Sequence, residues 1–488
     1  MTQQSSLKRK TISGLIWSFA DLIANQGIQF IIQIILARLL LPEHFGLVGM
    51  ILVFIAISNS IIDSGFSQAL IRQKNVSQED YSTVFYFNLV MGLVMYGILF
   101  IIADPISIFF GEPQLITILR VLSLVLIINS FGIIQRVFLI KNVDFRTQTK
   151  INMIAGITSG ILAVFFAVIG FGVWALVIKT VSMQIIQTLL LWILNKWVPS
   201  LVFNPQSFKR YFGFGSKLLV SGLIDTFYNN IYYVIIGRFF SASQLGYYTN
   251  AIKLRDIASQ SITTSVQRVT YPILSNIQED ENRLKNGYRK VIKTSSFIIF
   301  PIMVGLAAVA ESLINILFGE KWMGSVIYLQ LLCFAGMLYP LHSINLNILQ
   351  VKGRSDLFLL LEIIKKFILT VLIVISILLK LGVIGLISAA VLHSYIALFI
   401  NTYFSAREIS YSAKEQVKDL LPIYLVSMVM GIIVYFCGMK MNEGNLTKLI
   451  IQICIGVGIY ILLCGFAKIK ELNTIYGLML PLIKKIKS

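Results

Sequence analysis

Two stretches 200 residues apart share one pattern: IILARLLLPEHFGLV at 34–48 and VIIGRFFSASQLGYY at 234–248. Gly46 aligns with Gly246, and each glycine lies where one apolar segment ends and the next begins. A match that keeps its place relative to the apolar segments indicates an internal repeat rather than a chance similarity.

A second match keeps nearly the same register. ISIFFGEPQ at 106–114 resembles INILFGEKW at 314–322, with an offset of 208 residues. Each copy contains six apolar segments, so the two copies have the same orientation in a membrane and should be related by an axis along the membrane normal. This is one of the two repeat designs of secondary transporters, whose sites lie near the bilayer midplane between the repeats.

The composition excludes a water-soluble enzyme or nucleic-acid-binding domain. Of 488 residues, 57% are hydrophobic and 13% are charged, with a net charge of +19, whereas soluble proteins carry about 25% charged residues. About 20 apolar residues cross a bilayer, and lipid forces such spans to be helical. The sequence therefore predicts an all-α polytopic membrane protein with fourteen spans. They lie near 12–38, 45–66, 82–103, 115–138, 150–170, 172–194, 216–238, 246–270, 288–311, 325–350, 357–380, 383–404, 418–438 and 447–467.

The repeat and the span count divide the chain into three parts. An N-terminal lobe of six spans covers 1–205, a C-terminal lobe of six spans covers 206–412, and two extra helices with a basic tail cover 413–488. Most of the 41 Lys and Arg residues fall on the side that also holds both termini. The positive-inside rule places that side in the cytoplasm.

Polar side chains form stripes inside four spans that are repeat mates, namely the first with the seventh and the second with the eighth. Such residues are expensive in lipid and usually face a bundle interior or water. At about 100° per residue, the members of a stripe share one helix face. The stripes comprise Asp21, Asn25, Gln29 and Gln33; Asn59 and Asp63; Ser221, Asp225, Tyr228, Asn229 and Tyr232; and Lys253, Asp256, Gln260, Thr264 and Gln267.

We interpret these stripes as the lining of a central aqueous cavity. The alternative is hydrogen bonding that only holds the bundle together. Lys253 is the first candidate for binding an anion, although Asp256 three residues away could simply neutralise it. Lys179, Arg38 and Arg238 are further candidate cations, and the two arginines could instead extend to the membrane surface. Asp21, Asp63, Asp225 and Asp256 are candidates for coupling to H⁺ or Na⁺.

No enzymatic chemistry is expected. The sequence has no GxxxxGK[ST] phosphate-binding pattern, no nucleophile–base constellation and no metal-ligand spacing, and we expect no cofactor. His342 and His393 lie alone in apolar spans and favour a structural role, as do Glu362 and Lys365, which have ion-pair spacing.

Several motifs together resemble the bacterial polysaccharide-biosynthesis flippases. They are LLPEHFGLVGM (40–50), DSGFSQALIRQKNVSQEDYSTVFYFNL (63–89), FFGEPQ (109–114), GFGVWALV (170–177), QLGYYTNAIKLRD (244–256), VTYPILSNIQED (269–280) and EKWMGSVIYLQLLCFAGMLYPL (320–341). The likeness is to the Wzx-type group with colanic-acid and teichuronic-acid exporters, in the multidrug/oligosaccharidyl-lipid/polysaccharide exporter superfamily.

This resemblance implies a flippase of the bacterial inner membrane. Its substrate would be an undecaprenyl-diphosphate-linked oligosaccharide unit, turned outward by alternating access for O-antigen, capsule or exopolysaccharide synthesis. Membrane lipids, a polysaccharide polymerase and a chain-length regulator are the expected partners, and nucleic acid is not. Two alternatives stay open: a cation-coupled drug or cation antiporter of the same superfamily, and a membrane glycosyl polymerase.

Overall fold

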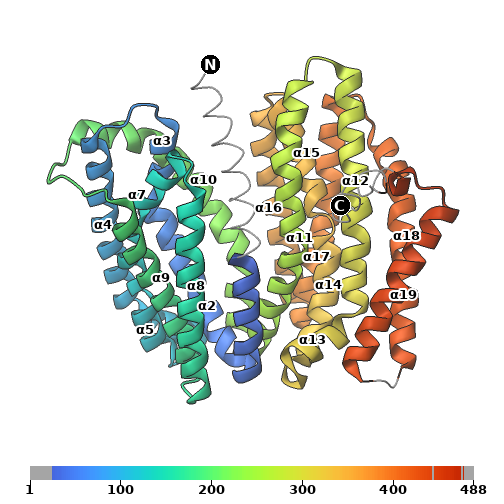
Figure 1. Ribbon diagram of the computed structural model, residues 1–488, viewed down its shortest axis with the longest axis horizontal. Coiled ribbons are helices and arrows are strands. Elements are labelled where there is room, and N and C mark those ends of the chain that lie inside the picture. Colours follow the sequence, from blue (N-terminus) through green and yellow to red (C-terminus); the bar gives the residue numbers. More distant parts are fainter. Residues whose placement is uncertain (1–24, 442–443, 474–475, 477–488) are drawn as a thin grey trace, which may run out of the picture. The chain divides into compact units, whose positions relative to one another are not determined.

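The computed structural model describes residues 25–441, 444–473 and 476, and these form helices joined by short connections, with no strand among them (Figure 1). The chain divides by its contacts into two compact units, Met1–Gly246 and Tyr247–Ser488. Backbone groups inside lipid have no water to bond, so helices that satisfy their own hydrogen bonds are the expected form of apolar segments of this length.

The first unit begins with a helix over residues 25–39. The helices that follow are α2 (Pro42–Asp63), α3 (Phe66–Arg72), α4 (Gln78–Ile101), α5 (Ala103–Phe110), α6 (Leu115–Leu122), α7 (Leu124–Lys141), α8 (Phe145–Val168), α9 (Val173–Asn195) and α10 (Pro205–Phe239). Within this unit α2 packs against α10 and α4, and α7 packs against α4 and α9.

A cluster of packed aromatic side chains lies at one end of the first unit, where α4 begins and α7 ends. Tyr81 of α4 lies with its ring centroid 4.3 Å from that of Phe138 on α7, and Trp197 packs beside both. Phe66 of α3 and Tyr211 of α10 are buried in the same cluster. The segment between α9 and α10 therefore lies against the start of α4.

The second unit holds the remaining helices. They are α11 (Ala242–Asn276, whose first turn belongs to the first unit), α12 (Glu281–Ala308), α13 (Ala310–Phe318), a 3₁₀ helix (Glu320–Ser325), α14 (Val326–Gly336), α15 (Tyr339–Val351), α16 (Ser355–Leu378), α17 (Gly382–Glu408), α18 (Ala413–Lys440) and α19 (Asn445–Phe466). Here α12 packs against α18, and α17 packs against α16, α14 and α15.

The repeat found in the sequence recurs as local structure. Two residues separate the helix over 25–39 from the next helix, which begins at Pro42, and two separate α10 from α11, which begins at Ala242. The FGE motifs also coincide: Gly111, with φ 73°, directly follows the end of α5, and Gly319, with φ 90°, directly follows the end of α13. Only glycine adopts such angles without strain, which explains why this residue is present in both copies.

Gly46 and Gly246 make reciprocal close contacts. A Cβ added to Gly46 would lie 1.8 Å from the carbonyl oxygen of Ala242, and one added to Gly246 would lie 1.9 Å from that of Pro42. The first turns of α2 and α11 thus meet backbone against backbone. The two repeated glycines are required for this approach because any larger residue would overlap main-chain atoms.

Among the described residues, ten helical segments are long and apolar enough to cross a membrane. Of the other four predicted spans, three coincide with the long helices α10, α11 and α16, and the first lies partly outside the described residues. Polar side chains lower the apolarity of α11, and α16 contains Glu362, Lys365 and Lys366. The helical membrane architecture is confirmed, whereas the count of fourteen stays a prediction.

The predicted division at 205/206 follows the repeat, but contacts divide the chain after Gly246. The difference concerns α10, which the repeat assigns to the second lobe and which packs against α2, α3 and α4. The division into two lobes, 1–205 and 206–412, and two extra helices with a tail, 413–488, stays a prediction.

Candidate functional site

The stripe of the first predicted span is only partly described. Asp21 lies outside the described residues, and Asn25 is half-buried. Gln29 points toward α8 and α9: its Nε2 lies 3.6 Å from the sulfur of Met183 and close to Gly156. In this structure Gln29 therefore contacts the interior of the first unit, while its role in substrate binding stays a prediction.

The stripe on α10 combines exposed and buried members. Asp225 and Asn229 are exposed, Tyr228 is half-buried, and Tyr232 is buried. A helix inside a membrane exposes side chains either to lipid or to water. The charge of Asp225 makes lipid contact expensive, so we retain the expectation that this face lines a cavity.

On α11, Asp256 does not form the ion pair with Lys253 that the sequence analysis considered. Asp256 accepts hydrogen bonds from Arg255, with Nη2 at 2.6 Å and Nε at 2.9 Å. The Arg255 guanidinium is itself buried and lies 5.0 Å from the ring centroid of Tyr339. Lys253 and Gln260 are exposed. Arg255 thus neutralises Asp256, and the Lys253 ammonium is not needed for that purpose.

Asp63 has a local structural contact. One of its carboxylate oxygens accepts hydrogen bonds from the backbone N–H of Ser67, at 3.3 Å, and from the Ser67 hydroxyl. Because α3 begins at Phe66, this carboxylate caps the first turn of that short helix. A role of Asp63 in ion coupling stays a prediction.

The other candidate cations differ in how far their side chains are exposed. Arg38 and Arg238 are exposed, and the Arg238 guanidinium lies 5.1 Å from the ring centroid of Phe109. Lys179 on α9 is half-buried. The isolated polar residues of the second unit have structural contacts: His342 lies 3.1 Å from the Ser394 hydroxyl, and Lys365 pairs with Glu362 at 2.6 Å.

Sequence reasoning missed a polar cluster inside the first unit. Asn129 of α7 donates to Asn59 of α2 at 2.8 Å and accepts from Gln184 of α9 at 3.2 Å. Its side-chain oxygen also accepts from Arg136, two helical turns further along α7. The sequence does place Asn129 and Arg136 on one helix face, because they are seven residues apart. Arg136 lies near the end of its predicted span, however, and is therefore counted among the cytoplasmic cations.

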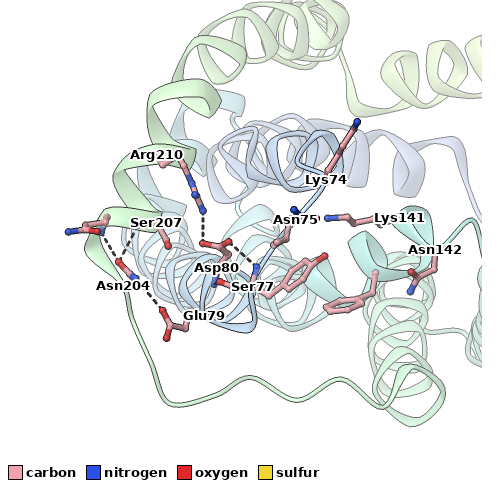
Figure 2. Close-up of a pocket in the computed structure, with 14 residues that line it drawn as sticks. Lys74, Asn75, Ser77, Glu79, Asp80, Lys141, Asn142, Asn204, Ser207 and Arg210 are labelled. Atoms are coloured by element: carbon pink, nitrogen blue, oxygen red, sulfur yellow. Dashed lines mark hydrogen bonds and ion pairs between the residues drawn. The ribbon is translucent and has the colours of Figure 1, made fainter.

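A cavity of about 960 Å³ opens at the end of the first unit that the charge bias predicts to be cytoplasmic (Figure 2). It lies among the α3–α4 connection, the end of α7 and the start of α10. Its polar lining includes Lys74, Asn75, Ser77, Glu79, Asp80, Lys141, Asn142, Asn204, Gln206, Ser207 and Arg210.

Asp80 is the central group of this cavity wall. Its side chain is 5% exposed and accepts from Arg210 at 2.8 Å and from the backbone N–H of Ser77 at 3.0 Å (Figure 2). It also accepts from the Tyr211 hydroxyl at 3.1 Å. Burial next to this carboxylate raises the pKa of Tyr211 to about 12, so the phenol stays protonated and donates. The carboxylate thereby joins the starts of α4 and α10.

The second unit contains the same ion pair with the charges exchanged. Arg289 of α12 binds Asp419 of α18 through two hydrogen bonds of 2.5 and 2.7 Å, and Tyr411 donates to the same carboxylate at 2.5 Å. Both pairs join residues 130 positions apart. The start of α12 is thus held to α18 as the start of α4 is held to α10.

Comparison with known proteins identifies the family. The family described as polysaccharide biosynthesis protein matches residues 35–327. The chain belongs to this family. The match covers both copies of the glycine motifs and ends at the start of α14, so the helices from α15 to α19 lie beyond it.

Curated relatives of this family member support the assignment. The teichuronic acid biosynthesis protein TuaB of Bacillus subtilis is 28% identical over 355 residues, covering 72% of this chain and 73% of TuaB. The lipopolysaccharide biosynthesis protein WzxC of Escherichia coli is 28% identical over 369 residues, covering 74% of each chain. The succinoglycan biosynthesis transport protein ExoT of Rhizobium meliloti is 27% identical over 306 residues, 63% of this chain and 62% of ExoT.

Solved structures identify the fold. The lipid II flippase MurJ in an inward closed conformation superposes with a TM-score of 0.74 and 16% identity, covering 93% of this chain and 98% of MurJ. An inward-facing multidrug resistance transporter of the MATE family gives a TM-score of 0.61 and 18% identity, covering 79% of this chain and 94% of that one. This family member therefore has the fold that MurJ and this MATE transporter share.

Cysteine labelling tests the predicted cavity. In a cysteine-free background, we expect Asp225→Cys and Gln260→Cys to react with a membrane-impermeant maleimide, because both positions are exposed and should face water. Val90→Cys is the matched control: Val90 is 57% exposed on α4 but apolar, so it should face lipid and stay unlabelled. Equal labelling of all three positions, or of none, would exclude the assigned cavity face.

Proposed function

We propose that this chain is a flippase that moves a polyprenyl-diphosphate-linked oligosaccharide from the cytoplasmic to the outer face of the bacterial inner membrane, without enzymatic chemistry. The observation that carries the proposal is the family match over 35–327, together with relatives named for surface-polysaccharide synthesis. The fold shared with the lipid II flippase MurJ supports it.

The charges of the chain suit such a substrate. A diphosphate needs cationic partners at membrane depth, where hydrogen bonds to charged groups are strong. Lys253, Lys179 and Arg136 offer such cations, and the amides Asn129 and Gln184 lie beside Arg136. Asn, Gln and Tyr side chains suit the many hydroxyl groups of an oligosaccharide.

Transport in this proposal follows alternating access, with both termini in the cytoplasm. A polysaccharide polymerase and a chain-length regulator would use the delivered substrate at the outer face. Asp225 is the first candidate for coupling to H⁺ or Na⁺, with Asp256 and Asp63 behind it because Asp256 pairs with Arg255 and Asp63 caps α3. The antiporter alternative gains no support from Asp256, whose charge is neutralised by Arg255.

Deleting the gene in its host tests the function. We expect lipid-linked oligosaccharide to accumulate, and mass spectrometry of the lipid extract would identify its sugars. Unchanged intermediates together with increased sensitivity to cationic compounds would replace the flippase with an antiporter.

Lys253→Ala tests the predicted anion-binding role of that lysine. We expect export to fall about ten-fold or more at an unchanged amount of protein in the membrane, since a charged hydrogen bond contributes about 1.5–3 kcal/mol. Lys74→Ala is the control, because Lys74 is an exposed lysine of the cytoplasmic cavity. Full export by Lys253→Ala would exclude the role.

A further inference from the structure

The arginine inside the first unit is placed by the cluster around it. Arg136 is half-buried on α7, five residues before the helix ends at Lys141, or about 7.5 Å along the axis. Its side chain extends back along the helix past Gly132, where an added Cβ would lie 3.5 Å from Nη2. The guanidinium therefore lies deeper in the span than its position in the sequence suggests.

Asn129 fixes the direction of this guanidinium. Arg136 donates through Nη2 to the side-chain oxygen of Asn129 and, at 3.5 Å, to its backbone carbonyl. The same amide is oriented from two other helices, by Asn59 of α2 and Gln184 of α9. Three helices of the first unit thus position one cation.

Part of the donor capacity of Arg136 is unused within the described residues. A guanidinium has five N–H donors, and only Nη2 makes hydrogen bonds in the described part of the chain. Asp63 is close enough for its charge to act on Arg136, but one of its oxygens is bonded to Ser67. A cation with free donors at this depth is costly unless an acceptor binds there.

We propose that Arg136, oriented by Asn129, binds a phosphate group of the transported lipid through its Nε and Nη1 donors. The inference rests on the proposed function and extends it, because it assigns a phosphate-binding residue to the interior of the first unit, on α7. Arginine suits phosphate because its donors lie in one plane and its charge does not titrate. The headgroup phosphate of an ordinary anionic phospholipid has the same chemistry.

Binding to the purified full-length protein tests the inference. The probes are undecaprenyl diphosphate and phosphatidylglycerol, each titrated into detergent-solubilised protein and followed by native mass spectrometry. We expect Arg136→Gln to weaken undecaprenyl diphosphate binding about ten-fold or more, and Arg136→Lys to weaken it less. The matched control is Arg120→Gln, because Arg120 lies on the neighbouring helix α6 and pairs with the exposed Asp104.

The outcomes are distinguishable. Unchanged binding by Arg136→Gln while the unaltered protein binds undecaprenyl diphosphate would overturn this inference and leave the flippase intact. Equal loss of both probes would assign the site to phospholipid headgroups and overturn the substrate role. Failure of the unaltered protein to bind undecaprenyl diphosphate would contradict the proposed function itself. If Arg136→Gln does not fold, Asn129→Asp gives the same test, since a carboxylate there should occupy the guanidinium and weaken binding.

Discussion

Gly46→Ala is expected to cause the largest loss of export among single methyl additions to this chain. The new Cβ would lie 1.8 Å from the Ala242 carbonyl oxygen, and main-chain atoms cannot move aside as a flexible side chain does. Overpacking costs about 1–3 kcal/mol even where side chains adjust, so α2 and the first turn of α11 must separate. Gly246→Ala should behave similarly, because its Cβ would meet the Pro42 carbonyl oxygen.

Gly97→Ala is the matched control for this prediction. Gly97 lies within α4 and has no atom within 4 Å of an added Cβ, and alanine is a better helix former than glycine. The measurement is surface polysaccharide per unit of membrane-inserted protein. Equal export by Gly46→Ala and Gly97→Ala would show that the close contact has no part in transport.

Asp80→Ala is expected to destabilise the first unit more than removal of any exposed carboxylate. The substitution leaves the Tyr211 hydroxyl and the Ser77 N–H without their acceptor and leaves Arg210 without its counter-ion. Losing such a carboxylate costs about 2–4 kcal/mol, which corresponds to a fall of roughly 5–10 °C in melting temperature.

Thermal unfolding of the purified protein checks this expectation. Asp104→Ala is the control, because the Asp104 side chain is 55% exposed and its pair with Arg120 should contribute less than about 1 kcal/mol. Asp419→Ala should reproduce the effect in the second unit, where the charges are exchanged. Identical melting of the Asp80 and Asp104 variants would refute the structural role of Asp80.

The repeat was the most informative part of the sequence. Gly46 and Gly246 lie at a close backbone approach, and Gly111 and Gly319 have the positive φ that favours glycine. A glycine that is required by the backbone conformation can be recognised in the sequence whatever side chains surround it. The lengths of the apolar segments alone were sufficient to predict the helical membrane fold.

The candidate site was less predictable because its contacts depend on side-chain length. From the sequence Lys253 is the expected partner of Asp256, yet the guanidinium of Arg255 reaches this carboxylate. Arg136 reaches back two turns to Asn129. Asp63 turned out to cap α3, a helix of seven residues that no apolar pattern predicts.

The most direct test of the account is the sidedness of the substrate in reconstituted vesicles. Purified protein is incorporated into liposomes that contain lipid-linked oligosaccharide on both faces, and an impermeant glycosidase then digests the sugars on the outside. We predict that nearly all of the oligosaccharide becomes accessible with the protein present, and about half without it. Equal digestion in both preparations would contradict the proposal that this chain moves the lipid across the membrane.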